Sequence, residues 1–495
     1  MTELMMHSLS PLLIIAFGLV LSLLLIAWHR SQKMILIFTL AIFVCALLAS
    51  ISLLINSTNA IQVTTLIKID NYGNFALVLV LVASIAVSLL SSKWLTHSVE
   101  VHDEFFILLQ LVALGAGVLV MSDHFASLFL GFELLSIALV GMVGYCRDSQ
   151  YSVESSFKYL ILSASASSFM LLGIAFIYSQ SGSLSFAMAL FVNKGGASEV
   201  SLFYHAGILL FLVGIAFKLS FAPFHLWTPD VYQGAPTPVT LLLATVSKVA
   251  MFVVLMKFWF SQSSLFVQPL NGMSSTLSSY HLMSVFAVSS MLIGNALALK
   301  QQNIKRLLAY SSIAHMGYLL IVLMITSQQS TDLAWQSALF YLSAYVLATV
   351  SLFMVLQFTQ AHHDSELTIV GWSGLFWQNR SLALLIIVGI LSLAGIPMTM
   401  GFMGKFYLLN VAVQAQQWWL IATLIIGSGI GLVYYLTIIF TLFSTNNITD
   451  INGINEKNES LILKPLVKIT VVTLIFFGVA LGVYPDLLSQ IFIKL

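Results

Sequence analysis

Long apolar runs follow one another along the whole 495-residue chain, with short polar connections between them. A run of about 20 apolar residues is long enough for a helix to cross the hydrocarbon core of a bilayer. The pattern predicts fourteen membrane-spanning helices, with no sheet and no soluble domain. The expected spans are residues 8–28, 34–55, 73–92, 104–121, 124–145, 156–180, 206–223, 237–260, 281–299, 304–326, 333–358, 380–410, 417–443 and 467–489.

Two of these spans contain a helix break. Pro223 lies in the seventh, five residues after Lys218, and Gly395-Ile396-Pro397 lies in the twelfth. Proline ends or kinks a helix because it lacks an N–H group and clashes with the preceding turn. Discontinuous helices at membrane depth are typical of transporters, where they surround a binding site or an ion pathway.

The order and spacing of spans four to eight resemble those of spans nine to thirteen, and the broken seventh span corresponds to the broken twelfth. A unit of five spans is odd, so two successive units must have opposite topology, as in many transporters. The sequence therefore predicts two inverted five-helix repeats. The expected divisions are residues 1–103 (helices 1–3), 104–260 (first repeat), 261–443 (second repeat) and 444–495 (a loop and helix 14).

Composition supports the membrane interpretation, because 59% of the residues are hydrophobic and only 7% are charged. Soluble domains carry about 25% charged residues. The net charge of +1 and the absence of a basic patch give no reason to expect nucleic acid as a partner. Cys45 and Cys146 lack the spacing of a disulfide framework, a zinc site or an iron–sulfur site. The first apolar run, residues 11–28, has neither a basic segment before it nor a small-residue cleavage site, so we interpret it as a retained span and not a signal peptide.

Lysine and arginine predict the orientation. Twelve of them lie beside the connections that follow odd-numbered spans, against three on the other side, so the former should be cytoplasmic. Both termini should then be periplasmic, in a bacterial inner membrane. Asp230 and residues 300–306 are expected on the cytoplasmic side, and residues 181–204 and 261–280 on the outer side.

Of the eighteen acidic residues, only Glu133 lies deep within an expected span. A buried carboxylate either takes up a proton or finds a cation. Lys218, beside the first helix break, is the expected cation. The pair could be a static link between two helices. In the alternative we favour, a change of charge on one group alters the proton affinity of the other, a role that suits lysine.

Two more lysines, Lys248 and Lys405, lie inside the eighth and twelfth spans, and both are candidate relay groups. Lys248 continues a small and polar helix face that begins at Thr237. Lys405 follows the second break by eight residues. Lys257 lies nearer a helix end, from which it can reach the interface.

Other polar residues leave alternatives open. His315 shares a face of the tenth span with Ser311 and Tyr318, which suits either a proton relay or a hydrogen-bonded structural histidine. His225 and Asp230, at the expected cytoplasmic mouth of the seventh span, suit proton entry or helix capping. Serines at 163–168 indicate close helix packing, with the lining of a water-filled path as the alternative.

No motif for a nucleotide or redox cofactor is present. The chain has no GxGxxG sequence in a βαβ unit, no P-loop, and no facing pair of haem-ligand histidines. Any redox chemistry coupled to this protein is therefore expected on other subunits.

Four long segments resemble the antiporter-like membrane subunits of respiratory complex I. They are FKLSFAPFHLWTPDVYQGAPTPV (217–239), LFLGFELLSIALVGMVGY (128–145), NIKRLLAYSSIAHMGYLL (303–320) and LSLAGIPMTMGFMGKFYLL (391–409). The resemblance extends over essentially the whole chain and is closest to the N-type members. The L-type ends in a long lateral helix, whereas this sequence stops just after its fourteenth span. The M-type commonly has glutamate where Lys405 stands.

The resemblance implies a fourteen-helix subunit of the membrane arm that translocates protons. Glu133 and Lys218 would form a pair, Lys248 would be the central relay, and Lys405 the exit-side group. It also implies partners in the membrane and peripheral arms, with NADH, FMN, iron–sulfur clusters and quinone on those other subunits. Two alternatives stay open: a subunit of a multisubunit cation/proton antiporter, and a structural membrane-arm subunit without a proton path.

Overall fold

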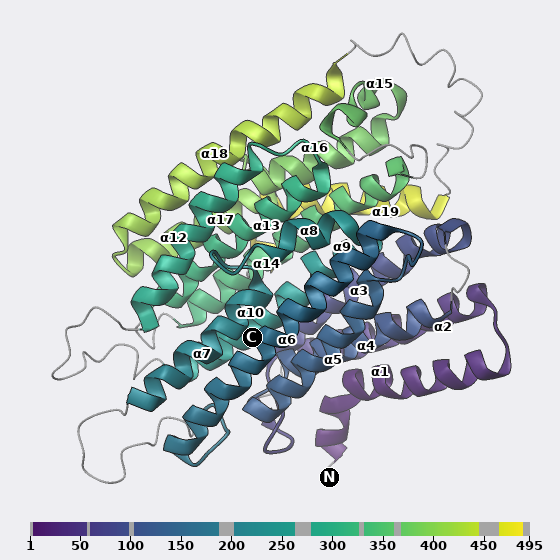
Figure 1. Cartoon of the computed structure of the whole chain (residues 1–495). Helices are drawn as coiled ribbons and strands as arrows, with labels where there is room; N and C mark the ends of the chain where they lie inside the picture. Colours follow the sequence, from purple (N-terminus) through teal and green to yellow (C-terminus); the bar gives the residue numbers. More distant parts are fainter. Residues whose placement is uncertain are drawn as a thin grey trace.

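The computed structural model describes residues 3–56, 60–98, 103–187, 202–262, 279–325, 331–360, 368–444 and 465–488. They form a bundle of long helices, with the first two helices at one flank and α18 at the opposite one (Figure 1). The helices that cover the first eight expected spans are α1 (Glu3–Trp28), α2 (Gln32–Ile55), α3 (Asn71–Ser98), α4 (Glu104–Val120), α5 (Phe125–Val143), α6 (Gln150–Ser181), α7 (Leu202–Leu219), α8 (Trp227–Gly234), α9 (Thr237–Ala244) and α10 (Val246–Ser261).

The remaining spans are covered by α12 (Ser279–Ala298), α13 (Ile304–Leu319) with the 3-10 helix η3 (Leu320–Met324), α14 (Thr331–Gln360), α16 (Arg380–Ala394), α17 (Met400–Gln414), α18 (Trp418–Phe443) and α19 (Pro465–Val483). Two short helices, η5 (Ile369–Trp372) and α15 (Leu375–Gln378), lie in the connection before α16. Each of the fourteen expected spans therefore coincides with helix. The expected loops at 181–204, 261–280 and 444–466 lie largely outside the described residues.

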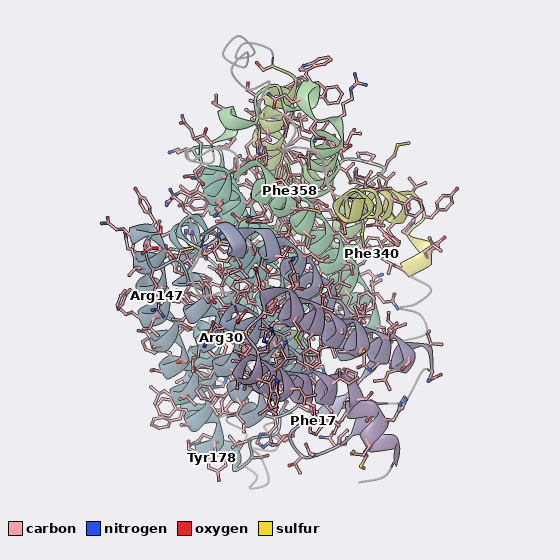
Figure 2. All side chains as sticks on the ribbon, turned by 90° about the vertical axis from the view of Figure 1, so that its right-hand side faces the viewer. Phe17, Arg30, Arg147, Tyr178, Phe340 and Phe358 are labelled. Atoms are coloured by element: carbon pink, nitrogen blue, oxygen red, sulfur yellow. The ribbon has the colours of Figure 1, made fainter. Side chains whose placement is uncertain are left out.

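Ten of the described helical stretches are long and apolar enough to cross a membrane, and four more are shorter apolar helices. Two of the shorter ones, α7 and α16, are the first halves of the spans expected to be broken. Large apolar side chains such as Phe17 and Tyr178 lie on the outside of the bundle, 66% and 50% exposed (Figure 2). The protein is a multi-pass membrane protein whose outer surface suits lipid or other apolar neighbours.

One small feature was not expected from the sequence. Strands β1 (Ile61–Gln62) and β2 (Lys68–Ile69) pair antiparallel in the connection before α3. Ile67 forms an isolated bridge with Ser122, and the Lys68 N–H bonds the Met121 carbonyl. This hairpin therefore fixes the start of α3 against the connection between α4 and α5.

The two five-helix repeats pack in the same way. In the first, α4 packs on α5 and on α10, and α6 packs on α7 and α8. In the second, α12 packs on α13 and on α18, and α14 packs on α16 and α17. Glycine allows the same close approach in both repeats: a Cβ atom on Gly115 would lie 2.8 Å from the Leu135 N, and one on Gly294 would lie 2.8 Å from the Ala314 N. Small residues are the usual means of bringing membrane helices together.

The eighth span is also interrupted, at Thr245 between α9 and α10. The Thr245 hydroxyl donates to the Leu241 carbonyl at 2.6 Å, a bond back along the helix that tends to bend it. No sequence signal indicates this break, because a threonine in an apolar helix is ordinary. The break lies one turn before Lys248.

Candidate functional site

The two expected helix breaks are built alike. After α7, Ser220 adopts a left-handed conformation (φ 62°) and the Phe221 N–H bonds the Ala216 carbonyl at 2.8 Å. After α16, Gly395 is left-handed (φ 78°) and the Ile396 N–H bonds the Leu391 carbonyl at 3.1 Å. This closure uses carbonyls that a helix end would otherwise leave unpaired. Both breaks thus end the first half-helix cleanly inside the protein.

A side chain from beyond each break satisfies one more carbonyl of the half-helix before it. The Trp227 indole donates to the Phe217 carbonyl at 2.9 Å, and the Lys405 ammonium donates to the Ala394 carbonyl at 2.8 Å. A cation is favourable at that position because the C-terminal end of a helix carries partial negative charge. The second break therefore holds a lysine where the first holds a tryptophan.

Lys218, in the last turn of α7, is 1% exposed. Its ammonium donates to the Ser136 hydroxyl at 2.8 Å and to the Tyr159 hydroxyl at 2.5 Å. The rings of Phe132 and Tyr159 lie about 5 Å away, within range of a cation–π interaction. Helices α5 and α6 thus supply two hydrogen bonds and two aromatic faces to this buried lysine.

Glu133 lies one turn from Ser136 on α5 and is only partly buried. It is close enough to act electrostatically on Lys218. The ion pairs found among the described residues do not include one between these two groups. The structure therefore places the expected pair in electrostatic range but with Ser136 and Tyr159, not Glu133, in contact with the ammonium.

Lys248 links the two repeats. It lies on α10, is fully buried, and donates to the hydroxyl of Ser312 on α13. The ring of Tyr232, from α8, lies 5.9 Å from its ammonium. An aromatic ring of the first repeat therefore lies beside the lysine that contacts the second repeat.

His315 lies on α13, close to Ser312, and is 4% exposed. Its two ring nitrogens are within hydrogen-bonding distance of the Tyr341 hydroxyl (2.6 Å) and the Tyr435 hydroxyl (3.1 Å). The Ser311 hydroxyl also bonds Tyr435, and the Tyr345 ring lies 5.6 Å from the imidazole. Both nitrogens therefore face hydroxyls that can donate or accept.

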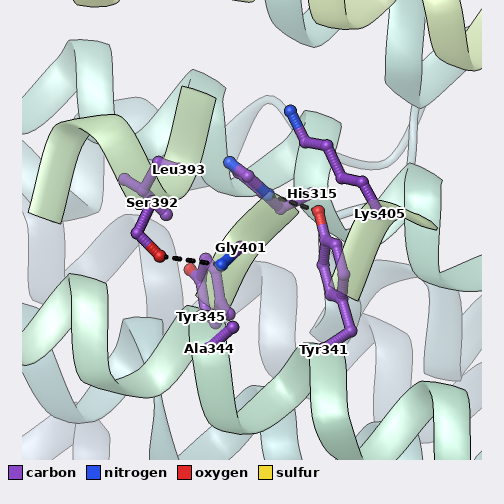
Figure 3. A pocket seen from close by; sticks show the side chains of 8 residues that line it. All are labelled: His315, Tyr341, Ala344, Tyr345, Ser392, Leu393, Gly401 and Lys405. Atoms are coloured by element: carbon purple, nitrogen blue, oxygen red, sulfur yellow. Dashed lines mark hydrogen bonds between the residues drawn. The ribbon is translucent and has the colours of Figure 1, made fainter. Parts of the chain in front are cut away.

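Lys405 ends the series. Besides the Ala394 carbonyl, its ammonium bonds the Ser428 hydroxyl at 2.7 Å, and the Tyr318 ring lies 5.3 Å from it. Lys405 and His315 both line a cavity of about 10 Å³, which has room for about one water molecule (Figure 3). The remaining lining residues are Tyr341, Ala344, Tyr345, Ser392, Leu393 and Gly401.

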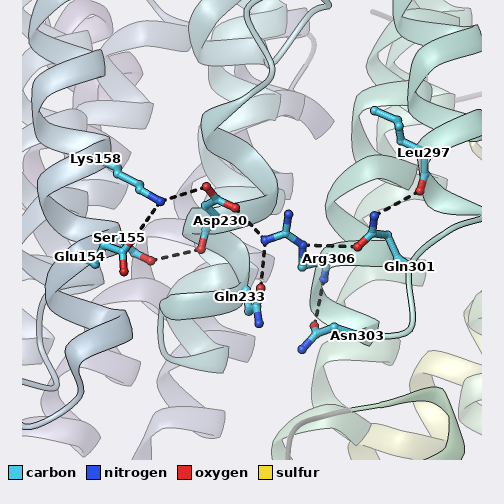
Figure 4. A network of polar contacts seen from close by, with 9 residues as sticks. All are labelled: Glu154, Ser155, Lys158, Asp230, Gln233, Leu297, Gln301, Asn303 and Arg306. Carbon is cyan, nitrogen blue, oxygen red and sulfur yellow. Dashed lines mark hydrogen bonds and ion pairs between the residues drawn. The ribbon is translucent and has the colours of Figure 1, made fainter.

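A second polar network lies at the α8 end of the first break (Figure 4). The Asp230 carboxylate pairs with Lys158 at 3.1 Å and with Arg306 at 2.7 Å, and Arg306 also bonds Gln233. Burial works against ionisation of Asp230, but these hydrogen bonds and positive charges hold its pKa below the usual range. Asp230 therefore joins α6, α8 and α13 and does not cap α8, whose N-cap residue is Leu226.

His225 lies between the two halves of the first break and is 6% exposed. Among the described residues its Nδ1 lacks a hydrogen-bond partner, and its ring packs edge-on against Tyr310. None of the ion pairs of Asp230 within that part of the chain involves the His225 side chain.

Lys257 lies apart from these groups. It forms an ion pair with Asp70 at 2.9 Å, at the end of α10 and the start of α3, with side chains 8% and 20% exposed. Of the expected serine cluster, Ser163 and Ser167 are buried, whereas Ser165 and Ser168 are exposed and bond carbonyls of their own helix. No group of three or more His, Cys, Asp or Glu side chains able to hold a metal occurs among the described residues.

Sequence reasoning missed the hydroxyl groups that join the charged residues. They are Ser136, Tyr159, Ser312, Tyr341, Tyr435 and Ser428. Serine and tyrosine are common in apolar helices, so their spacing alone did not distinguish most of them. Ser136, one turn from Glu133, and Ser312, one turn from His315, carried a usable positional signal.

Most of the chain is similar to known proteins. Residues 122–431 match the family described as NADH:quinone oxidoreductase/Mrp antiporter, TM. A chain of respiratory complex I from Thermus thermophilus, solved with bound aureothin, is 29% identical. That similarity covers 96% of this chain and 98% of the other, with a TM-score of 0.79.

Two other solved structures share the fold. A chain of the archaeal membrane-bound sulfane sulfur reductase is 21% identical, with a TM-score of 0.82. A chain of the Mrp complex from Dietzia sp. DQ12-45-1b is 18% identical, with a TM-score of 0.81. Each match covers all of this chain and 97% of the other.

Proposed function

The chain belongs to the NADH:quinone oxidoreductase/Mrp antiporter family of membrane subunits, and from that premise we propose that it translocates protons as the N-type subunit of a bacterial complex I. Electron transfer from NADH to quinone takes place on other subunits, which carry FMN and iron–sulfur clusters. The work of this chain is to move protons through its membrane-embedded lysines.

The observation that carries this proposal is a buried polar series across both repeats. Lys218, Lys248, His315 and Lys405 succeed one another, and each is in contact with at least one hydroxyl. Hydroxyls can accept a proton on one side and donate one on the other. Ionisable groups within membrane spans are costly and usually mark proton or ion paths.

In this proposal each lysine alternates between its charged and neutral forms. Glu133 acts electrostatically on Lys218, so the proton affinity of that lysine depends on whether the Glu133 carboxyl on α5 is charged. The static alternative, an ion pair that joins α5 to α7, would require direct contact, and Lys218 contacts Ser136 and Tyr159.

The test of the relay is a double variant, Lys248→Arg with Lys405→Arg. Arginine keeps its charge and effectively cannot release the proton, so we expect proton uptake by inside-out vesicles on NADH addition to fall sharply. Lys257→Arg is the matched control, because arginine can keep the ion pair with Asp70 outside the series. Full pumping by the assembled double variant would refute the relay and leave the lysines a static role.

The test of the Glu133 coupling uses two substitutions at one position. Glu133→Ala should strongly reduce pumping and NADH:quinone turnover, whereas Glu133→Asp, which keeps the carboxylate, should largely preserve both. An alanine variant that assembles normally and pumps at the parental rate would show that Glu133 has no functional part.

The proposal also includes a location in the bacterial inner membrane, with both termini periplasmic and with membrane-arm and peripheral-arm subunits as partners. Lys405, where the M-type commonly has glutamate, favours the N-type. Orientation can be tested with single cysteines in a background without Cys45 and Cys146. An impermeant maleimide applied to intact cells should label a cysteine at Ser275, which lies outside the described residues, and not one at Asn303.

A cation/proton antiporter subunit is the second candidate, because the family includes Mrp antiporters and a Mrp chain shares the fold. Gentle solubilisation and identification of the co-purifying chains separates the two. Flavin and iron–sulfur subunits support complex I, whereas their absence from an intact assembly supports an antiporter.

A further inference from the structure

Asn295 of α12 joins two tyrosines beside the last lysine. Its amide nitrogen donates to the Tyr318 hydroxyl at 2.9 Å and to the Met291 carbonyl at 2.7 Å. Its amide oxygen accepts from the Tyr434 hydroxyl at 3.0 Å. Both amide hydrogens are therefore used, and the side chain, 1% exposed, has a single orientation that satisfies its neighbours.

Two glycines on α18 leave the space in which Asn295 lies. A Cβ atom on Gly427 would lie 3.0 Å from the Tyr318 hydroxyl oxygen and 3.2 Å from the Asn295 amide nitrogen. A Cβ atom on Gly431 would lie 3.1 Å from the Asn295 amide oxygen. Either substitution would force a polar group to move, because real Cβ contacts are seldom so short. Gly429, between them, has nothing within 4 Å of its Cβ position.

Asn295 holds the hydroxyl group of Tyr318, and the ring of that tyrosine faces the Lys405 ammonium. The Lys405 ammonium is 5.3 Å from the centre of the Tyr318 ring, and Tyr318 is 1% exposed. The other titratable groups facing Lys405 are His315 of α13 and Tyr341 and Tyr345 of α14, which line the same cavity. An aromatic face attracts a cation more strongly when both are out of water. The orientation of that ring therefore changes the balance between charged and neutral lysine.

We propose that Asn295, seated against Gly427 and Gly431, is a positioning residue that holds the Tyr318 ring over Lys405 and so sets the pH range in which this lysine exchanges its proton. The proposal rests on the proposed function and adds a residue whose side-chain hydrogen bonds, among the described residues, go to Met291, Tyr318 and Tyr434 and to none of the relay lysines. Loss of the tether frees the ring, so the charged form of Lys405 loses a favourable contact. The lysine then gives up its proton at lower pH.

The experiment measures initial proton uptake by inside-out vesicles, divided by the rate of NADH oxidation, from neutral to alkaline pH. The variants are Asn295→Leu, which removes the tether at similar volume, Tyr434→Phe, which removes one of its bonds and is the milder change, and Gly431→Ala. Gly429→Ala is the matched control on the same helix. Lys405→Met reports whether the proposed function holds, and assembly is checked for every variant.

We expect the alkaline limb of the profile to move to lower pH by about half a unit in Asn295→Leu and Gly431→Ala, which is ~0.7 kcal/mol at 1.36 kcal/mol per unit. Tyr434→Phe should move it less, and Gly429→Ala not at all. A merely structural role would lower the amount of complex without moving the limb.

An unmoved limb in assembled Asn295→Leu, Tyr434→Phe and Gly431→Ala, with Lys405→Met inactive, would overturn the positioning role and leave the proposed function intact. Parental pumping by Lys405→Met would overturn both, because the lysine would then not be part of the relay.

Discussion

Gly395→Ala tests whether Lys405 must sit at the end of α16. Gly395 is the left-handed C-cap residue of that helix, and its added Cβ would lie 2.8 Å from the Lys405 Cδ and 3.1 Å from its Nζ. The methyl group cannot be accommodated unless the lysine tip moves. That movement breaks or lengthens the bonds to the Ala394 carbonyl and the Ser428 hydroxyl.

Gly395→Ala has two free-energy costs, and only one of them involves Lys405. A left-handed alanine costs about 1–2 kcal/mol at any position. Weakening one hydrogen bond to a charged group adds about 1.5–3 kcal/mol. If the second cost falls on the step that uses Lys405, about 2 kcal/mol slows that step by about 30-fold.

Gly182→Ala isolates the backbone cost. Gly182 is the left-handed C-cap residue of α6 (φ 66°), and nothing lies within 4 Å of its Cβ position. Proton uptake per NADH oxidised, measured on vesicles with equal amounts of assembled complex, should fall in Gly395→Ala and stay near parental in Gly182→Ala. Equal pumping by the two variants would refute the reasoning, because the collision with Lys405 would then have no consequence.

Three further predictions concern other contacts. Tyr159→Phe removes the 2.5 Å bond to Lys218, worth about 1.5–3 kcal/mol for a charged group, so vesicle pumping should fall about tenfold or more with assembly intact; parental pumping would contradict this. Lys257→Met leaves Asp70 without its cation, at a cost of about 1–3 kcal/mol for a partly buried pair, between the values for exposed and buried pairs, so complex yield should fall and Asp70→Asn should partly restore it. Because the pKa of Asp230 is depressed, its stabilisation is present above the unfolded-state value of about 4 and is lost as pH falls through the folded-state value. As pH falls through the acid range, the solubilised parental complex should therefore lose more thermal stability than the Asp230→Asn complex. Identical plots of thermal stability against pH for the two complexes would count against this role.

The sequence alone was sufficient for the fold class. Apolar runs of membrane length predicted every span, because hydrocarbon tolerates only segments that satisfy their own backbone hydrogen bonds. Pro223 and Gly395-Ile396-Pro397 located both expected breaks, since backbone chemistry is local. The break at Thr245 was missed, because a threonine whose hydroxyl bonds back to a carbonyl is compatible with an unbroken helix, as at Thr349 in α14.

The charged members of the candidate site were also visible in the sequence. A lysine, histidine or glutamate inside an apolar run is costly, so Lys218, Lys248, Lys405, His315 and Glu133 could be selected without coordinates. Their order along the chain gave no information about which would be neighbours.

Only the tertiary structure decided what surrounds each charge. Contacts between different helices place Tyr159 on Lys218, Ser312 on Lys248 and Ser428 on Lys405. A serine or tyrosine has no fixed role until packing brings a partner within about 3 Å. The charged members of the site could therefore be identified from the sequence, whereas the hydroxyls that contact them could be identified only from the packing of the helices.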